Sequence, residues 1–79
     1  MTTSQNILAV DDDSSIVTLV GTLLETEGFA VDCCNSGEEA LARVQAKDYD
    51  LVILDIMMPG MDGYETCRLI RAFSDVPII

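Results

Sequence analysis

The sequence predicts an α/β protein in which parallel strands alternate with helices around one central sheet. Two continuous apolar runs, Ile7–Val10 and Leu51–Leu54, each end at an aspartate, and amphipathic segments lie between them. Short unbroken runs of this kind are typical of parallel strands that are covered on both faces. The 79 residues have room for one domain, so we assign residues 1–79 to a single unit.

The first β–α–β unit is expected between Ile7 and Cys34. Its helix repeats apolar residues at the three-and-four spacing of one helical face: Ile16, Leu19, Val20, Leu23 and Leu24. Asp13 or Ser14 can cap the start of this helix, and Gly28 suits the left-handed residue that follows its end. A weaker strand pattern, Phe29–Cys34, completes the unit.

A second helix and a third strand follow. Ser36–Glu39 reads Ser-Gly-Glu-Glu, which matches the capping-box pattern of a helix N-terminus. The inward face of this helix is expected to carry Ala40, Leu41 and Val44. The apolar run Leu51–Leu54 then returns the chain to the sheet.

The C-terminal third predicts one more helix and the start of a fourth strand. After the turn-forming pair Pro59-Gly60, Asp62 can cap the helix while the Glu65 side chain reaches back to the cap. One stripe of this helix carries Gly63, Cys67 and Ile70. Val76–Ile79 begins another strand. The alternation of strands and helices implies a parallel sheet with right-handed crossovers.

The charge excludes nucleic acid as a direct partner of this segment. The net charge is −10, from 14 acidic and 4 basic residues, whereas phosphate backbones require clustered Lys and Arg. Such a charge also weakens the compact state through self-repulsion. A divalent cation would relieve that repulsion wherever several carboxylates converge.

Cysteine and histidine usage excludes several kinds of site. There is no histidine, and Cys33, Cys34 and Cys67 show no Cys-x-x-Cys spacing, which argues against zinc sites and histidine-based catalysis. We expect buried, reduced thiols in a cytoplasmic protein. Met1–Asn6 lacks the features of a signal peptide, and no apolar run reaches membrane-spanning length, so no membrane association is expected.

Three aspartates mark the predicted site. If the first and third strands are neighbours, Asp11 and Asp55 meet at the carboxyl edge of the sheet, and Asp12 can turn into the same crevice. Hard oxygen ligands without sulfur or imidazole suit Mg²⁺ or Mn²⁺. An aspartate beside such an ion is a plausible nucleophile toward phosphorus. Each feature alone has a duller explanation, since Asp11–Asp13 could simply be a helix-capping loop.

The segments Ile7–Asp12 and Leu51–Gly63 resemble the receiver domain of bacterial two-component response regulators. They read Ile-Leu-Ala-Val-Asp-Asp and Leu-Val-Ile-Leu-Asp-Ile-Met-Met-Pro-Gly-Met-Asp-Gly. Ser36–Leu41 and Val76–Ile79 also fall where that family has similar segments. The resemblance covers essentially the whole chain. It implies a flavodoxin-like, doubly wound parallel sheet with strand order 2-1-3-4.

The resemblance implies roles for individual residues. Asp55 matches the aspartate that accepts a phosphoryl group from a histidine kinase or a phosphotransfer protein. Asp11 and Asp12 match the acidic pair at the Mg²⁺ site, where the second usually ligates the ion directly and the first acts through water. The backbone carbonyl of Met57 matches the remaining protein ligand. Asp13 falls at a variable position, as a cap or a surface charge.

The chain departs from the family pattern toward its end. Receiver domains continue to a Ser or Thr after the fourth strand and a Lys after the fifth, and both contact the phosphoryl group. Lys47 does not match that lysine, and the fourth helix, fifth strand and fifth helix are also missing, so we interpret residues 1–79 as a truncated receiver domain. We expect an intact metal site, impaired switching, and a partly bare first-helix face that favours self-association or domain swapping.

Two other functions compete with the phosphoacceptor. One is a phosphate-independent interaction module, against which the intact Asp11, Asp12 and Asp55 argue. The other is an enzyme with an aspartate nucleophile, such as a haloacid-dehalogenase-like phosphatase. Those enzymes typically carry a second aspartate two residues after the nucleophile, where this chain has Met57.

Overall fold

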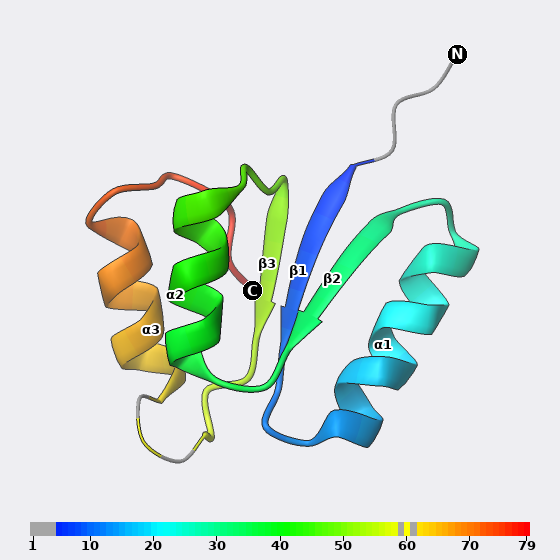
Figure 1. Cartoon of the computed structure of the whole chain (residues 1–79), viewed down its shortest axis with the longest axis horizontal. Coiled ribbons are helices and arrows are strands. Elements are labelled where there is room, and N and C mark those ends of the chain that lie inside the picture. The colour runs from blue at the N-terminus through cyan, green and yellow to red at the C-terminus, as the bar shows by residue number, and fades with distance from the viewer. Residues whose placement is uncertain (1–4, 59, 61) are drawn as a thin grey trace.

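Three parallel strands form the centre of the molecule (Figure 1). The computed structural model describes residues 5–58, 60 and 62–79. The strands are β1 (Asn6–Val10), β2 (Ala30–Cys34) and β3 (Leu51–Leu54). They lie in the order β2-β1-β3, and both pairings are parallel. The predicted parallel α/β fold is therefore confirmed. Of the segments discussed above, residues 1–4, Pro59 and Met61 lie outside the described residues.

Residues 76–79 extend the sheet beyond β3. The Val52 N–H donates to the Pro77 carbonyl at 2.8 Å, and the Ile79 N–H donates to the Val52 carbonyl at 3.0 Å. Val52 and Ile78 form a parallel bridge. The predicted fourth strand thus lies beside β3, which confirms the order 2-1-3-4, although it makes a single bridge and not a full strand.

The helices cover the two faces of the sheet unequally. They are α1 (Ser14–Thr26), α2 (Gly37–Ala46) and α3 (Gly63–Arg71). Helix α1 lies on one face, beside β2, whereas α2 and α3 pack together on the other face (Figure 1). This is the distribution that right-handed crossovers require in a doubly wound sheet.

Local sequence signals place the first two helices. Asp13 caps α1, its Oδ1 accepting from the N–H groups of Ser15 at 2.9 Å and Ile16 at 3.2 Å. The Ser36 hydroxyl caps α2 by accepting from the Glu39 N–H at 3.1 Å. Both are predicted caps, and they satisfy amides that lack a partner in the first helical turn.

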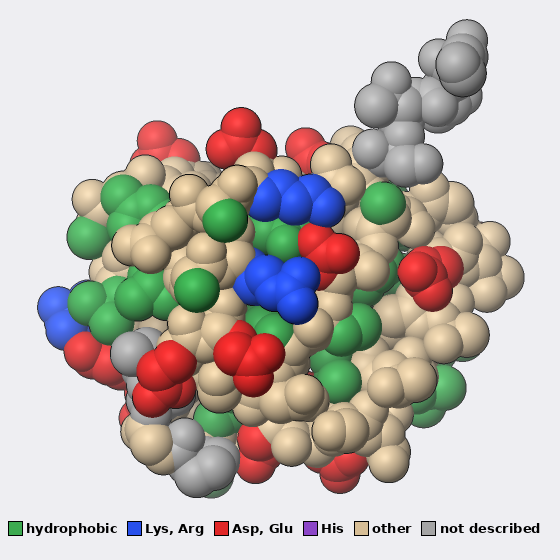
Figure 2. Space-filling model, in the orientation of Figure 1, with side chains coloured by type: hydrophobic (Ala, Val, Ile, Leu, Met, Phe, Trp, Pro, Cys, Tyr) green, Lys and Arg blue, Asp and Glu red, His purple; other side chains and the backbone are tan. Residues whose placement is uncertain are grey.

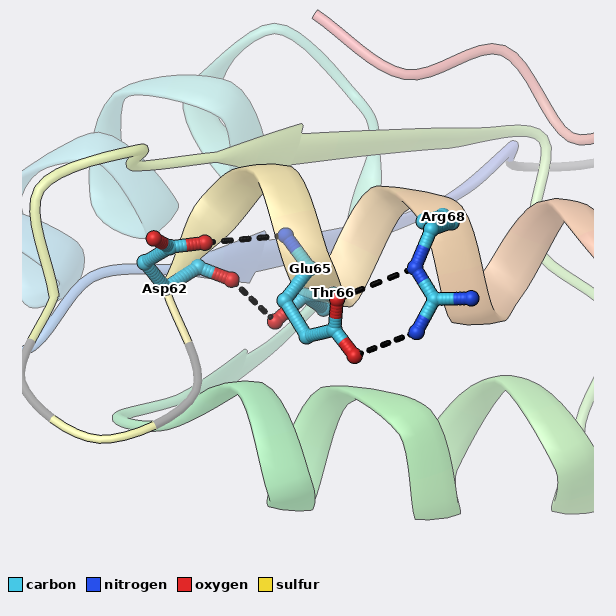
Figure 3. A network of polar contacts seen from close by, with 4 residues as sticks. All are labelled: Asp62, Glu65, Thr66 and Arg68. Carbon is cyan, nitrogen blue, oxygen red and sulfur yellow. Dashed lines mark hydrogen bonds and ion pairs between the residues drawn. The ribbon is translucent and has the colours of Figure 1, made fainter.

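Helix α3 starts as predicted, with one difference at Glu65. Asp62 Oδ1 accepts from the Glu65 N–H at 2.9 Å, and the Thr66 hydroxyl donates to the Asp62 carbonyl at 2.8 Å. The Glu65 carboxylate does not return to the cap but accepts from Arg68 Nε at 3.0 Å (Figure 3). The reach-back prediction is therefore wrong, because a cation one turn along the helix competes for the same carboxylate.

The main core lies between the sheet and the pair α2 and α3. Its most deeply buried members contribute aliphatic side chains from β1, β3 and α3: Leu8, Val52 and Ile70, each 0% exposed. Ala40 and Val44 of α2 are also buried there, as predicted, and Leu41 packs partly buried against the same cluster. This core fixes β3, and so the residue that follows it, against the rest of the sheet.

The opposite face is thinly covered. Val17 and Gly21 of α1 are buried, and a Cβ atom at Gly21 would lie 3.0 Å from Cys33 Sγ, so the helix approaches β2 closely at that point. The apolar side chains of α1 that remain exposed are Ile16 (48%), Leu19 (60%) and Leu23 (59%). In the described part of the chain α1 alone rests on this side, and its exposed apolar side chains agree with the expectation of a partly bare α1 face.

The cysteines are free, but they are not all buried. Cys34 faces the main core, and its burial raises the thiol pKa to about 11. Cys33 is exposed, which corrects the expectation for that residue. It lies on β2, an edge strand, beneath the incompletely covered α1 face.

Among the described helices, none has the length and apolar character needed to cross a membrane.

Candidate metal centre

The pairing of β1 with β3 brings two aspartates to the same edge of the sheet. Val10 at the end of β1 lies opposite Leu54 at the end of β3. The next residue of each strand continues the ladder, since the Asp55 N–H donates to the Val10 carbonyl at 3.0 Å. The Asp11 N–H donates to the Cys34 carbonyl of β2 at 3.2 Å. Both aspartates are therefore held by their main chains.

Three carboxylates converge at this edge. One carboxylate oxygen from each of Asp11, Asp12 and Asp55 lies within 4.8 Å of the others. Asp11 and Asp55 are half-buried, whereas Asp12 is exposed. The structure thus brings together the three side chains that the sequence predicts for the site.

The charges of the neighbouring carboxylates act on the pKa of Asp11. The backbone N–H of Asp13 donates to Asp11 at 3.0 Å and lowers the Asp11 pKa. Partial burial and the negative charges of Asp55 and Asp12 act in the opposite direction, and the net result is a raised Asp11 pKa. A divalent ion among these oxygens would remove the repulsion that raises it. The donor set, all carboxylate oxygen, suits Mg²⁺ or Mn²⁺.

A turn on the other side of the cluster holds Asp11 in place. The Asn35 side-chain amide donates to the Asp11 carbonyl at 3.1 Å and to Ser14 Oγ at 3.4 Å. It thereby ties the loop after β2 to the loop after β1. Asn35 was not among the residues predicted for the site. The available signal was an amide side chain directly after a strand, at the sheet edge where the aspartates were already expected.

The loop after β3 orients Asp55. The Met57 N–H donates to Asp55 Oδ1 at 3.0 Å, so one carboxylate oxygen is fixed by its own loop. The Met57 side chain points outward and is 80% exposed. Asp13, by contrast, serves as the α1 cap and stays outside the carboxylate cluster, as expected.

Nearly the whole chain matches a known protein family. Residues 7–79 match the family described as the response regulator receiver domain. The chain is 46% identical over 78 residues to the transcriptional regulatory protein ResD of Bacillus subtilis, covering 99% of this chain and 32% of ResD. The chain therefore spans about a third of the length of this curated relative.

Solved structures agree with the fold and the family. The N-terminal domain of a response regulator receiver protein from Methanoculleus marisnigri superimposes with a TM-score of 0.91 at 42% identity, over 96% of this chain and 64% of that one. A chain from the complex of histidine kinase ThkA with response regulator protein TrrA gives a TM-score of 0.88 at 44% identity, covering 94% and 65%.

Proposed function

This chain belongs to the response regulator receiver domain family, and we propose that it is a phosphoacceptor whose Asp55 side chain receives a phosphoryl group in a two-component system. The observation that carries the proposal is the convergence of Asp55 with Asp11 and Asp12 at one sheet edge. In this role the chain is modified stoichiometrically, as a signalling switch, and is not a turnover enzyme.

Asp11, Asp12 and Asp55, with the backbone carbonyl of Met57, would hold Mg²⁺, and Mn²⁺ is an alternative. The bound ion screens the negative charge between an attacking carboxylate and the phosphoryl oxygens. The fit is supported by the all-oxygen donor set and by the raised pKa of Asp11.

In phosphoryl transfer, the residues of this chain would act by orienting the Asp55 carboxylate. Met57 N–H holds Asp55 Oδ1, which directs the other oxygen, Oδ2, to act as the nucleophile. That oxygen attacks the phosphorus of a phosphohistidine on the donor protein. The new O–P bond forms as the N–P bond breaks, and the electron pair stays on the imidazole nitrogen, which then takes up a proton from solvent.

The proposed donor is a histidine kinase or a phosphotransfer protein. The match to a chain from the ThkA–TrrA complex supports a kinase as the class of partner. We also propose that the chain self-associates through the exposed apolar side chains of α1.

Acetyl phosphate with Mg²⁺ tests the central proposal. Incubation should add one phosphoryl group to the chain, located on Asp55 by peptide mass spectrometry after reductive trapping. Asp55→Asn should not be phosphorylated. Asp50 is an exposed aspartate outside the cluster, so Asp50→Asn should be phosphorylated like the chain without a substitution. Hydrolysis of phosphate esters with turnover would favour the phosphatase alternative. Inertness toward both acetyl phosphate and beryllofluoride would favour an interaction module.

A further inference from the structure

The first turn of α3 rests directly on the backbone that carries Asp55. The Gly63 N–H donates to the Ile56 carbonyl at 3.3 Å. A Cβ atom at Gly63 would lie 2.3 Å from Ile56 Cα, 2.6 Å from the Asp55 carbonyl oxygen and 2.9 Å from the Ile56 nitrogen. Real Cβ contacts are essentially never closer than 3.0 Å. All three neighbours are backbone atoms, so no side-chain rotation can make room.

The requirement for glycine here is spatial. Gly28 and Gly60 adopt positive φ angles, but Gly63 does not, because it is the first helical residue of α3. An alanine at Gly63 would fit the helix and would still collide with the Asp55–Ile56 peptide. One of the two segments would have to move by roughly 0.7 Å, the gap between 2.3 Å and the closest normal contact.

The structure indicates which segment would give way. Helix α3 is held at its start by the contacts among Asp62, Glu65 and Thr66 (Figure 3). Thr66 and Ile70 are both 0% exposed, so the helix is also anchored in the core. The two residues after Asp55 are less buried, since Ile56 is 44% exposed and Met57 is 80% exposed, whereas Met58 is anchored in the core. Displacement should therefore fall mainly on Ile56 and Met57, which adjoin and orient the Asp55 carboxylate.

We propose that Gly63 is a positioning residue for Asp55. Its missing side chain lets α3 seat against the Asp55–Ile56 peptide, and this contact sets the direction of the Asp55 carboxylate toward Asp11 and Asp12. The inference rests on the proposed phosphoacceptor function for its kinetic consequence. Its structural consequence concerns the metal-free chain and does not depend on that function.

The test compares Gly63→Ala with Ile70→Val. The second variant weakens the core packing of the same helix but leaves the contact with Asp55 untouched. Phosphorylation from saturating acetyl phosphate, expressed per folded molecule, should slow about 10- to 100-fold in Gly63→Ala, as expected for a sub-ångström misplacement of the nucleophile. Ile70→Val should retain the normal rate constant. The concentration of acetyl phosphate giving half the maximal rate should change little in either variant.

Two further readouts separate this inference from the proposed function. In the Mg²⁺-free chain, the amide resonance of Met57 should shift in Gly63→Ala and not in Ile70→Val, because its N–H is bonded to Asp55 Oδ1. The Mg²⁺ affinity, measured by thermal shift, should fall in Gly63→Ala alone. If Gly63→Ala unfolds, the measurements are made in sucrose sufficient to restore its helical signal.

Normal rate, affinity and Met57 resonance in Gly63→Ala would overturn the positioning role while leaving the phosphoacceptor proposal standing. If the chain without a substitution binds Mg²⁺ but is never phosphorylated, the proposed function is overturned. The Met57 amide resonance and the Mg²⁺ affinity of Gly63→Ala would then decide the positioning role. If Ile70→Val also changes the phosphorylation rate, the Mg²⁺ affinity and the Met57 resonance, the effects of Gly63→Ala come from a weakened helix, and Gly63 only stabilises the fold.

Discussion

The Asp32 carboxylate joins two side chains from the segment between α2 and β3. The Tyr49 hydroxyl donates to Asp32 Oδ2 at 2.6 Å, and Lys47 Nζ donates to the same oxygen at 3.0 Å. The Lys47 ammonium also lies 5.4 Å from the centroid of the Tyr49 ring. Figure 2 shows basic side chains over the α2 side of the molecule with acidic ones close by. Lys47 thus has a structural role, consistent with its mismatch to the family's phosphate-contacting lysine.

Replacing Tyr49 by Phe should destabilise the chain by about 1–2 kcal/mol. The ring would still fill its site, where the residue is 9% exposed, but Asp32 would lose its shortest hydrogen bond. Urea denaturation at pH 7 measures the change. Tyr64→Phe, at a tyrosine that is 70% exposed, is the matched control and should have no measurable effect.

The Tyr49–Asp32 bond should be lost in strong alkali. Burial, followed by the hydrogen bond to Asp32, raises the Tyr49 pKa to about 12 from its ordinary value of 10.0. Because the folded-state pKa is the higher one, the stabilisation is complete below pH 10 and declines as the pH rises through about 12. The stability difference between the unmodified chain and Tyr49→Phe should shrink over that window. A difference that stays constant from pH 9 to the end of the alkaline transition would contradict the assignment.

The contacts of Asp32 with Tyr49 and Lys47 should also make the stability of the chain depend on pH in acid. The hydrogen bond from Tyr49, followed by the one from Lys47, lowers the Asp32 pKa below its ordinary value of 3.8. A lowered folded-state pKa gives stabilisation that is present above pH 3.8 and is lost as the pH falls through the folded value. Acid unfolding of Asp32→Asn should therefore depend less steeply on pH than that of the unmodified chain.

Mg²⁺ should stabilise the chain through Asp12. Binding to the folded state alone raises the free energy of unfolding by about 2.7 kcal/mol at a concentration 100 times the dissociation constant. Asp12→Ala should abolish this increase, measured as the shift of the melting temperature with Mg²⁺. Asp13→Asn removes a neighbouring charge but keeps a good capping side chain, so its Mg²⁺ response should remain. An unmodified chain without any response would refute the metal site.

The starts of the helices were predictable, because capping depends on residues close in the sequence. The way a helix packs on the sheet was less predictable, because it depends on contacts with other segments. The caps at Asp13, Ser36 and Asp62 follow from short side chains that accept from nearby amides. The apolar periodicity of α1 correctly predicts a helix. It does not reveal which residues meet the sheet: Val17 and Gly21, both outside the predicted apolar set, are buried, because Gly21 lets the helix approach β2 closely.

The α2 cap offers a test at a residue that is not a member of the carboxylate cluster. Ser36→Ala removes the acceptor for the Glu39 N–H and should destabilise the chain by about 1 kcal/mol. Ser36→Asp restores an acceptor and should recover most of the loss. Denaturant midpoints at constant slope report both values. An equal loss in both variants would show that the hydroxyl matters for a reason other than capping.

For the molecule as a whole, the site was predictable because topology alone assembles it. Parallel strands place Asp11 and Asp55 at one edge wherever β1 and β3 are neighbours. The supporting residues were not predictable in the same way. Asn35 acts on Asp11, 24 residues away, and Gly63 acts through a close backbone contact with Asp55 and Ile56, and no local pattern distinguishes such a glycine from an ordinary helix start.

The uneven covering of the sheet predicts self-association of the 79-residue chain. Leu19 and Leu23 expose 60% and 59% of their surface on α1, and Ile79 exposes 73% at the outer edge beyond β3. Apolar surface and an open strand edge on the same molecule favour pairing with a second copy. Sedimentation velocity should show a dimer whose proportion rises with concentration.

Charge on the α1 face should reverse this association. Leu19→Glu with Leu23→Glu should weaken the dimer at least about tenfold, the equivalent of about 1.4 kcal/mol, because two carboxylates would have to be buried at the interface. Tyr64→Glu places one such carboxylate on an exposed side chain of α3, on the opposite face of the sheet, and should leave the dimer intact. Equal weakening by both changes would point to general charge repulsion in a chain of net charge −10. A chain that sediments as a monomer throughout would show that the bare α1 face is tolerated in water.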